Sequence, residues 1–401
     1  MIKSKILIKN SIQKKYLDKN YIKKLSKDFQ QIIDEVINDT DKSNKTLNVL
    51  NNKFKFNFTQ KDLKKFRKFK TIVLIGMGGS ILGAEAINNF LKKKIKKKIY
   101  FFDNLDPKKI ANFKKEKNLK KILFLIISKS GNTIETLSNF LSLNIIKKNS
   151  KNIILISEKK NNFLFSLSKR FNLFFIEHNN YIGGRYSVLS EVGIIPAYLM
   201  DLDILKLRSC TLKFLKNKKK LFLKDSSIKL ASLLNSKKIN NLIFLNYSPE
   251  LEKFLFWCQQ LIAESLGKKG RGFLPMISNV PKDHHSLLQL YLDGPKDKLF
   301  YIFSLEEKIN IQKIKNKNTF LNKKNLNTIK DAQKKSLIKT FNKKKIPFRE
   351  FKISKINEET LGELFSYFIL ETVITGKLIK INPYDQPGVE QVKIYTKNLL
   401  S

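Results

Sequence analysis

The chain has 401 residues, of which 42% are hydrophobic, so it is long enough for two or three globular domains with sizeable cores. Its formal net charge is +45, but the lysines are spread over the whole length, which is typical of a general compositional bias and argues against a dedicated nucleic-acid surface. No stretch approaches the roughly 20 apolar residues of a membrane span, and the N-terminus lacks the apolar core of a signal peptide.

The cysteine content predicts a protein of a reducing compartment. The chain holds two cysteines, Cys210 and Cys258, which lie far apart and have no metal-ligating neighbour in the sequence. Neither a disulfide framework nor a zinc site is therefore expected, and a cytoplasmic location is the simplest prediction.

The N-terminal segment, residues 1–50, is rich in Lys, Asn and Ile with apolar residues at helical spacing. Residues 21–25 and 29–37 show this pattern most clearly. We expect helices that pack on the outside of the rest of the chain, and no residue of this segment indicates a particular chemistry.

The first candidate binding turn comes after a predicted strand at residues 71–75 and runs from Gly76 to Ala84 before a helix. A glycine-rich turn between a strand and a helix can hold a phosphate on its free backbone N–H groups. The spacing fits neither the dinucleotide fingerprint nor the Walker loop. The sequence thus predicts a tight turn that offers Gly79 and Ser80 to an anion, with loop packing alone as an equal alternative.

The second candidate turn comes after six consecutive apolar residues, 122–127, which predict a strand buried on both faces of a parallel sheet. A hydroxyl cluster comes next and includes Ser128, Ser130 and Thr133, and a helical pattern begins at Ile134. Hydroxyl groups at a helix N-terminus suit a phosphate, because the free N–H groups and the helix dipole attract an anion. Plain helix capping by the same side chains is an equal alternative.

Further strands at residues 98–102 and 152–156 alternate with helical segments, which is typical of a doubly wound α/β domain. Both candidate turns would then lie beyond the carboxyl ends of the strands, where such domains bind ligands. Arg185, after two glycines, could point its guanidinium into the same cleft, or it could be a surface charge at a helix start.

The pattern restarts near residue 200 and predicts a second α/β domain. Its strands are expected at residues 241–245, 299–303 and 348–353, and its helices at 250–266 and about 358–375. The Lys- and Asn-rich residues 305–346 indicate loops or exposed helices. The predicted organisation is a helical segment at 1–50, a first domain at 51–200, a second domain at 201–380 and a C-terminal helix within 381–401.

Gln260 and Glu264 are four residues apart and share one face of the second-half helix. Glu264 lies in the last turn before Gly267, where the negative end of the helix dipole disfavours a charged carboxylate. In a dry site such a carboxylate could take part in proton transfer. The alternative is an exposed acid close to Lys268 and Lys269.

Two further groups of residues could take part in catalysis or binding. His284 and His285 are adjacent and point in different directions, so at most one of them is expected to reach a given site. Residues 382–393 form a turn followed by a helix that carries Lys393 in its first or second turn.

Taken together, these stretches resemble the glucose-6-phosphate isomerase family, which has the sugar-isomerase fold. The resemblance rests on six stretches in the family's order, namely Gly76–Gly83, Ser128–Thr136, Gly183–Ser187, Gln260–Lys268, Asp283–Gly294 and Asn382–Lys393. One such stretch would be weak, but six in register are specific. The resemblance implies two doubly wound parallel-sheet sugar-isomerase domains with helical N-terminal and C-terminal segments, and a homodimer.

The resemblance also implies roles for individual residues. The substrate phosphate would be held by Gly79, Ser80, Ser128, Ser130 and Thr133, while Gln260 and Gln386 would line the site. The catalytic residues would be Glu264 as the base, Arg185 near the reacting carbons, His285 in ring opening and Lys393 at the sugar ring. His285 would be supplied across the dimer interface, and the Ser286 directly after it favours it over His284.

The implied activity is the reversible conversion of glucose 6-phosphate to fructose 6-phosphate through an enediolate, in glycolysis and gluconeogenesis. It implies a small sugar phosphate as partner, no metal, no cofactor, no specific nucleic acid and no membrane. Two alternatives stay open: a broader phosphoglucose and phosphomannose isomerase, and a non-catalytic regulator that senses sugar phosphates. Such a regulator would be expected to carry a helix-turn-helix, and residues 1–50 contain no clear pair of short helices around a glycine turn.

Overall fold

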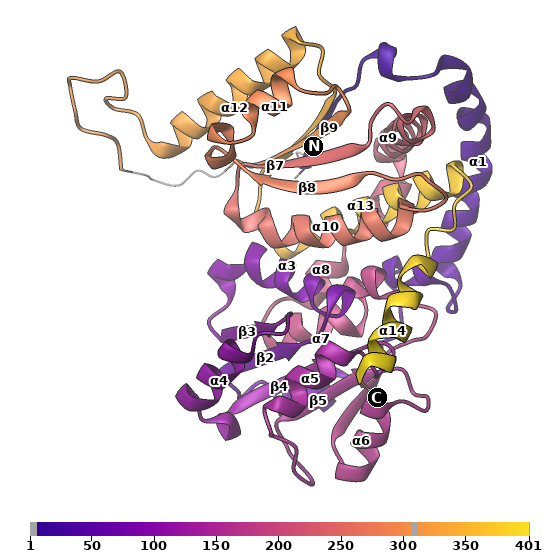
Figure 1. Cartoon of the computed structure of the whole chain (residues 1–401), viewed down its shortest axis with the longest axis vertical. Helices are drawn as coiled ribbons and strands as arrows, with labels where there is room; N and C mark the ends of the chain where they lie inside the picture. Colours follow the sequence, from indigo (N-terminus) through magenta and orange to yellow (C-terminus); the bar gives the residue numbers. More distant parts are fainter. Residues whose placement is uncertain (1–5, 307–311, 401) are drawn as a thin grey trace.

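The computed structural model describes residues 6–306 and 312–400, and within them the chain forms two five-stranded sheets, one above the other in Figure 1. Both sheets are doubly wound and mostly parallel, so the predicted fold class is confirmed. The strands of the first sheet are β2 (Thr71–Ile75), β3 (Lys98–Phe102), β4 (Ile122–Ile127), β5 (Ile153–Ser157) and β6 (Phe174–Glu177).

The first sheet has the order β3-β2-β4-β5-β6, and all of its strands are parallel. Every residue of β4 is buried, as the uninterrupted apolar run predicted. The chain leaves β2 toward β3 on one side and returns to β4 on the other, so the strand order reverses between β2 and β4. Ligands of doubly wound sheets bind at such a reversal, and both candidate phosphate turns come directly after these two strands.

The helices after β2 and β4 lie on opposite faces of the first sheet. α3 (Leu82–Phe90) contributes Ile87 to the core between the two sheets, whereas α5 (Ile134–Ser142) contributes Phe140 to a separate core on the outer face. This arrangement opens a crevice between the two helix starts. The outer face also carries α4 (Pro107–Glu116) and α6 (Phe163–Phe171).

The second sheet repeats this build. Its parallel strands have the order β8-β7-β9-β10, and β1 is added antiparallel to β10 at the edge. The strands are β1 (Ile6–Ser11), β7 (Asn241–Asn246), β8 (Leu274–Asn279), β9 (Lys298–Leu305) and β10 (Phe348–Ile353). The helices after these parallel strands are α10 (Glu252–Leu266) after β7, α11 (Leu288–Asp293) after β8, α12 (Leu326–Lys343) after β9 and α13 (Glu358–Leu378) after β10.

The largest apolar core lies between the sheets and is shared by both. Leu74 of β2 and Phe244 of β7 both belong to it, while their neighbours Val73 and Ile243 face the two outer cores. The helices α3 and α10 occupy this middle layer in Figure 1. The two halves are therefore fused through one core, and the division into domains near residues 50, 200 and 380 stays a prediction.

The other helices are α1 (Lys19–Asp41), α2 (Gln60–Lys64), α7 (Glu191–Leu199), α8 (Ile204–Arg208), α9 (Asn217–Ser236) and α14 (Glu390–Leu400). In Figure 1, α14 descends from the second sheet's half of the molecule toward the first sheet's half. Among the described residues, no helix has the length and apolar character needed to span a lipid bilayer.

The expectation for the N-terminal segment was wrong in part. Residues 19–41 are helical as predicted, but Ile6–Ser11 form β1 and complete the edge of the second sheet. Ile6 is buried and Leu7 is exposed, an alternation typical of a strand with one covered face. Residues 1–5, and 307–311 of the segment expected to be loops or exposed helices, lie outside the described residues. The rest of that segment includes α12, which buries Phe341.

Candidate active site

The hydroxyl cluster lies between the carboxyl end of β4 and the N-terminus of α5. Ser128 Oγ is 2.8 Å from Thr133 Oγ1, which is 3.5 Å from Ser130 Oγ, so the three predicted phosphate ligands converge. Thr133 is the N-cap residue of α5, but its side chain caps no backbone N–H. Helix capping therefore does not explain why a threonine occupies this position. Gly131 has φ +69°, and a Cβ there would stand 1.9 Å from Asn162 Oδ1.

The glycine-rich turn after β2 is packed tightly against other parts of the site. A Cβ on Gly78 would come within 2.6 Å of Gln260 Nε2 of α10. A Cβ on Gly79 would stand 2.2 Å from the carbonyl carbon of Gly184 and 2.5 Å from the amide nitrogen of Arg185. The turn after β2 therefore packs directly against the Gln260 side chain of α10 and against the backbone of Gly184 and Arg185. Gly79 thus has a clear packing role, and its part in phosphate binding stays a prediction, as does that of Ser80.

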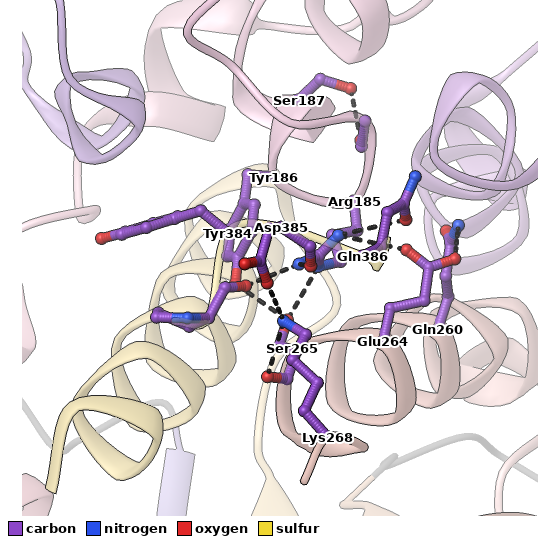
Figure 2. Close-up of polar contacts among 12 residues, drawn as sticks. Arg185, Tyr186, Ser187, Gln260, Glu264, Ser265, Lys268, Tyr384, Asp385 and Gln386 are labelled. Carbon is purple, nitrogen blue, oxygen red and sulfur yellow. Dashed lines mark hydrogen bonds and ion pairs between the residues drawn. The ribbon is translucent and has the colours of Figure 1, made fainter. Parts of the chain in front are cut away.

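Arg185 is buried, with 3% of its surface exposed, and its guanidinium is surrounded by acceptors (Figure 2). Nη1 donates to Glu264 Oε2 at 3.2 Å and to Gln386 Oε1 at 3.3 Å. Nη2 donates to the carbonyl oxygens of Pro383 at 2.6 Å and Asp385 at 2.9 Å. The alternative that Arg185 is a surface charge is wrong. Its guanidinium is buried, and hydrogen bonds from both Nη atoms fix the planar group in one orientation.

Glu264 lies in the last turn of α10 and is held from two sides. Gln260 Nε2 donates to its Oε1 at 2.9 Å, and Arg185 holds the other oxygen. The carboxylate is 29% exposed, so solvent reaches it. The alternative of an exposed acid close to Lys268 and Lys269 is wrong, because Glu264 is partly buried and bonded to Arg185, while Lys268 pairs with Asp385 at 2.9 Å. The predicted one-face geometry of Gln260 and Glu264 is confirmed.

The remaining predicted residues divide into two groups. Gln386 joins the cluster through Arg185, whereas Lys393 lies in α14 and pairs with Glu390 on the same helix at 2.7 Å. His285 is exposed at the end of a short 3-10 helix, Lys282–His285. In the described part of this single chain, neither Lys393 nor His285 has a hydrogen bond or ion pair to the cluster of Arg185, Glu264 and Gln386.

The other two histidines face different surroundings. His284 is half-buried, and its Nε2 lies 3.2 Å from the hydroxyl of Tyr247. His178 is buried, and burial lowers its pKa to about 4. Within residues 6–306 and 312–400, no group of three or more His, Cys, Asp or Glu side chains is placed to hold a metal ion.

Comparison with known proteins identifies the family to which the chain belongs. Residues 34–272, more than half of the chain, match the family model for phosphoglucose isomerase. The chain belongs to the phosphoglucose isomerase family. The resemblance inferred from the six stretches is therefore confirmed.

Relatives in this family are similar over most of their length. The chain is 36% identical over 356 residues to a "Probable glucose-6-phosphate isomerase" of Methanococcus maripaludis, covering 83% of this chain and 79% of that relative. It is 33% identical over 349 residues to the "Glucose-6-phosphate isomerase" of Methanocaldococcus jannaschii, covering 82% and 84%. Among solved structures, a hypothetical protein of Thermus thermophilus has the same fold, with a TM-score of 0.82, 22% identity and coverage of 98% and 100%.

Two residues of this phosphoglucose isomerase site were not predicted from the sequence. Ser265 is fully buried, and its Oγ accepts from Arg185 Nε at 2.8 Å. The hydroxyl of Tyr186 lies 2.8 Å from the same Oγ and donates to the carbonyl oxygen of Pro383 at 2.7 Å. Each comes directly after a predicted site residue in the sequence. These hydroxyls tie the end of α10 to the segment that bears Gln386.

We expect Tyr186→Phe to lower kcat by roughly tenfold while KM changes little, because a lost buried hydrogen bond of ~1–2 kcal/mol would loosen Arg185 at the reacting end. The phosphate end of the site is untouched by this change. The measurement is steady-state kinetics with thermal unfolding of the same samples.

Tyr384→Phe is the matched control for this change. Its ring lies 5.5 Å from that of Tyr186, but its buried hydroxyl has no hydrogen-bond partner among the described residues. It should leave kcat unchanged. Equal losses of kcat in the two variants would mean that ring packing matters and that the Tyr186 hydroxyl does not position Arg185.

Proposed function

We propose that this protein interconverts glucose 6-phosphate and fructose 6-phosphate. The observation that carries the proposal is the cluster of Glu264, Arg185, Gln260 and Gln386. Its carboxylate and guanidinium lie 3.2 Å apart, and the turn after β2 packs against Gln260 and the backbone of Arg185. An aldose–ketose isomerisation needs both groups: a base that moves a proton and a fixed cation that stabilises an enediolate. Membership of the phosphoglucose isomerase family supports the same reaction.

In the proposed reaction Glu264 removes the proton from C2 of the open aldose. The electron pair of the C–H bond forms the C1–C2 double bond, and the carbonyl electrons move onto O1, which gives the enediolate. Arg185 stabilises the negative charge without titrating itself. A proton then passes from O2 to O1, and Glu264 returns the proton taken from C2 to C1 while the electron pair on O2 re-forms a carbonyl at C2, which gives the ketose.

The substrate phosphate would bind at Ser128, Ser130 and Thr133, with the start of α5 adding its free N–H groups. Gly79 and Ser80 would close the same end of the site. Gln260 and Gln386 would contact the sugar hydroxyls, since each amide already touches a member of the cluster.

We propose that His285 opens the sugar ring. Within the described residues of one chain it has no hydrogen bond or ion pair to the cluster, which fits a site completed by a second copy of the chain. His285 is exposed and therefore accessible to a partner subunit. We therefore propose a homodimer in which each site takes Glu264 from one chain and His285 from the other. Lys393 of α14 would assist at the sugar ring. A cytoplasmic location stays the prediction from the cysteine content.

The direct test is a coupled assay of fructose 6-phosphate conversion, run in parallel with mannose 6-phosphate. Turnover of fructose 6-phosphate to glucose 6-phosphate alone is expected. Comparable turnover of mannose 6-phosphate would favour the broader isomerase, and binding without turnover would favour a sugar-phosphate sensor.

Mixing two inactive variants tests the shared site. We expect Glu264→Gln and His285→Ala homodimers to be nearly inactive, and mixed dimers to regain activity, because each mixed dimer holds one site with an intact Glu264 and an intact partner histidine. The measurement is activity after subunit exchange. Mixtures of Glu264→Gln with His284→Ala serve as a control, since His284→Ala should be active by itself. Mixed dimers that stay inactive would place His285 in the site of its own chain or outside the reaction.

A further inference from the structure

A polar cavity of about 610 Å³ lies at the carboxyl ends of β7 and β9. Tyr247 and Ser248 line it just after β7, and Ser304 lines it at the end of β9. The start of α12 forms the remaining wall, with Lys330 and Lys334 among its side chains. None of the residues predicted for the candidate active site lines this cavity.

The position of this cavity in the second sheet is the same as that of the candidate phosphate site in the first. The order β8-β7-β9-β10 reverses between β7 and β9, as the order of the first sheet reverses between β2 and β4. After β7, α10 enters the core between the sheets, and after β9, α12 lies on the opposite face, above the second sheet in Figure 1. Such a reversal opens a crevice where doubly wound sheets bind ligands.

The charges of the cavity indicate what it would bind. Lys334 is only 6% exposed, and its Nζ donates to Ser304 Oγ at 3.0 Å and lies 3.3 Å from Asp331 Oδ1. A buried ammonium is costly unless it has partners, and Ser304 and Asp331 supply such partners to Lys334 at the cavity wall. Glu350, 3.9 Å from Lys334, has a buried Oε1 without a hydrogen-bond donor among the described residues.

The lining combines cations, carboxylates and neutral polar groups. The cations are Lys330, Lys334, Lys335 and Lys352, and the acids are Glu250, Glu306 and Asp331. Lysines pair with a phosphate. Carboxylates accept hydrogen bonds from the hydroxyl groups of a polyol, and the hydroxyls of Ser248 and Ser304 can accept or donate them. The volume lies within the range of ~300–1,000 Å³ that small-molecule sites occupy.

We propose that this cavity is a second binding site, for a phosphorylated polyol, separate from the candidate active site. The lysines on α12 hold its phosphate, and the acids and serines hold its hydroxyl groups. The proposal does not depend on the isomerase reaction, because a protein without that activity would still present the same crevice.

The test is isothermal titration calorimetry of the full chain with glucitol 6-phosphate, which has no carbonyl group and cannot be isomerised. We expect two sites per chain in the wild type. Ser128→Ala with Thr133→Ala should remove the first and leave the second. Lys330→Ala with Lys334→Met should leave the first and weaken the second by at least about tenfold, since a charge-assisted hydrogen bond contributes that much.

Lys330→Ala alone is the safer variant, because its side chain is only partly buried and no salt bridge of the described residues involves it. It should weaken the second site without changing the fold, as checked by circular dichroism. Lys339→Ala, an exposed lysine of α12 outside the cavity, is the matched control and should change neither site. A wild-type isotherm with one site that disappears in the Ser128 and Thr133 variant would overturn the proposal, as would a second site unaffected by Lys330→Ala. Isomerase activity is measured separately on the same samples, so that loss of the proposed reaction and loss of this site are distinguished.

Discussion

Glu264→Gln is expected to lower kcat by ~10²–10⁴-fold with little change in KM, the usual loss when a general base is removed. Glutamine keeps the size of the side chain. Its oxygen can accept from Arg185 and its amide nitrogen can donate to Gln260 once that amide turns over, so the substrate should bind. It cannot take up a proton from carbon. The measurement is steady-state kinetics in both directions of the reaction.

Isotope exchange separates this explanation from a structural one. Because the Glu264 carboxylate is 29% exposed, the wild-type enzyme run in D₂O should place deuterium in the product, and the variant should not. Glu252→Gln makes the same change on the same helix, twelve residues earlier, where the carboxylate accepts from Asn279 at 2.7 Å. That control should retain wild-type kcat. Exchange at the wild-type rate in Glu264→Gln would assign the base to another group.

The central strands were predictable because a strand that is buried on both faces needs apolar residues at nearly every position. The apolar runs of β2, β4 and β7 are covered on both faces, so each is a continuous run bounded by polar turns. The turns after them could be recognised as candidate binding turns because parallel strands place all their carboxyl ends at one edge. From these facts the fold class and the place of the candidate phosphate site could both be proposed.

Three of the four edge strands, β8, β6 and β1, were not predicted, each for its own reason, whereas the fourth, β3, was predicted at residues 98–102. β8 contains Pro275, which disfavours a strand in a sequence pattern, but at the edge of a sheet its missing N–H costs little. β6 has only four residues and begins soon after Asn172, the left-handed residue that ends α6. β1 pairs with β10, more than 300 residues later in the chain, and no local pattern reveals such a partner.

The candidate site was predictable in residue types but not in contacts. Gln260 and Glu264 could be paired from helical spacing alone, and the structure has them 2.9 Å apart. The partners of Arg185 come from α10 and from residues 383–386, and only the folded chain brings these segments together. Buried hydroxyls such as that of Ser265 gain their importance from such long-range contacts, so the sequence pattern could not single them out.

Gly79→Ala is expected to reduce both stability and activity, because the close approach of two loops leaves no room for a methyl group. The added Cβ would stand 2.2 Å from the carbonyl carbon of Gly184 and 2.5 Å from the amide nitrogen of Arg185, and both are backbone atoms that cannot rotate away. Overpacking of this kind costs ~1–3 kcal/mol or more. The 184–185 backbone would shift, and a displacement of about 1 Å at the reacting groups can cost ~10²-fold in rate.

The measurement combines chemical denaturation with kcat, and Gly388→Ala is the control for stability. A Cβ at Gly388 would meet no atom within 4 Å, so that variant should unfold at the same denaturant concentration as the wild type. In Gly79→Ala, the fall in kcat should exceed any rise in KM if the loop contact chiefly positions Arg185. A variant with wild-type stability and kcat would show that the two loops separate easily, and the contact between Gly79 and Gly184 would then have no part in holding the guanidinium in place.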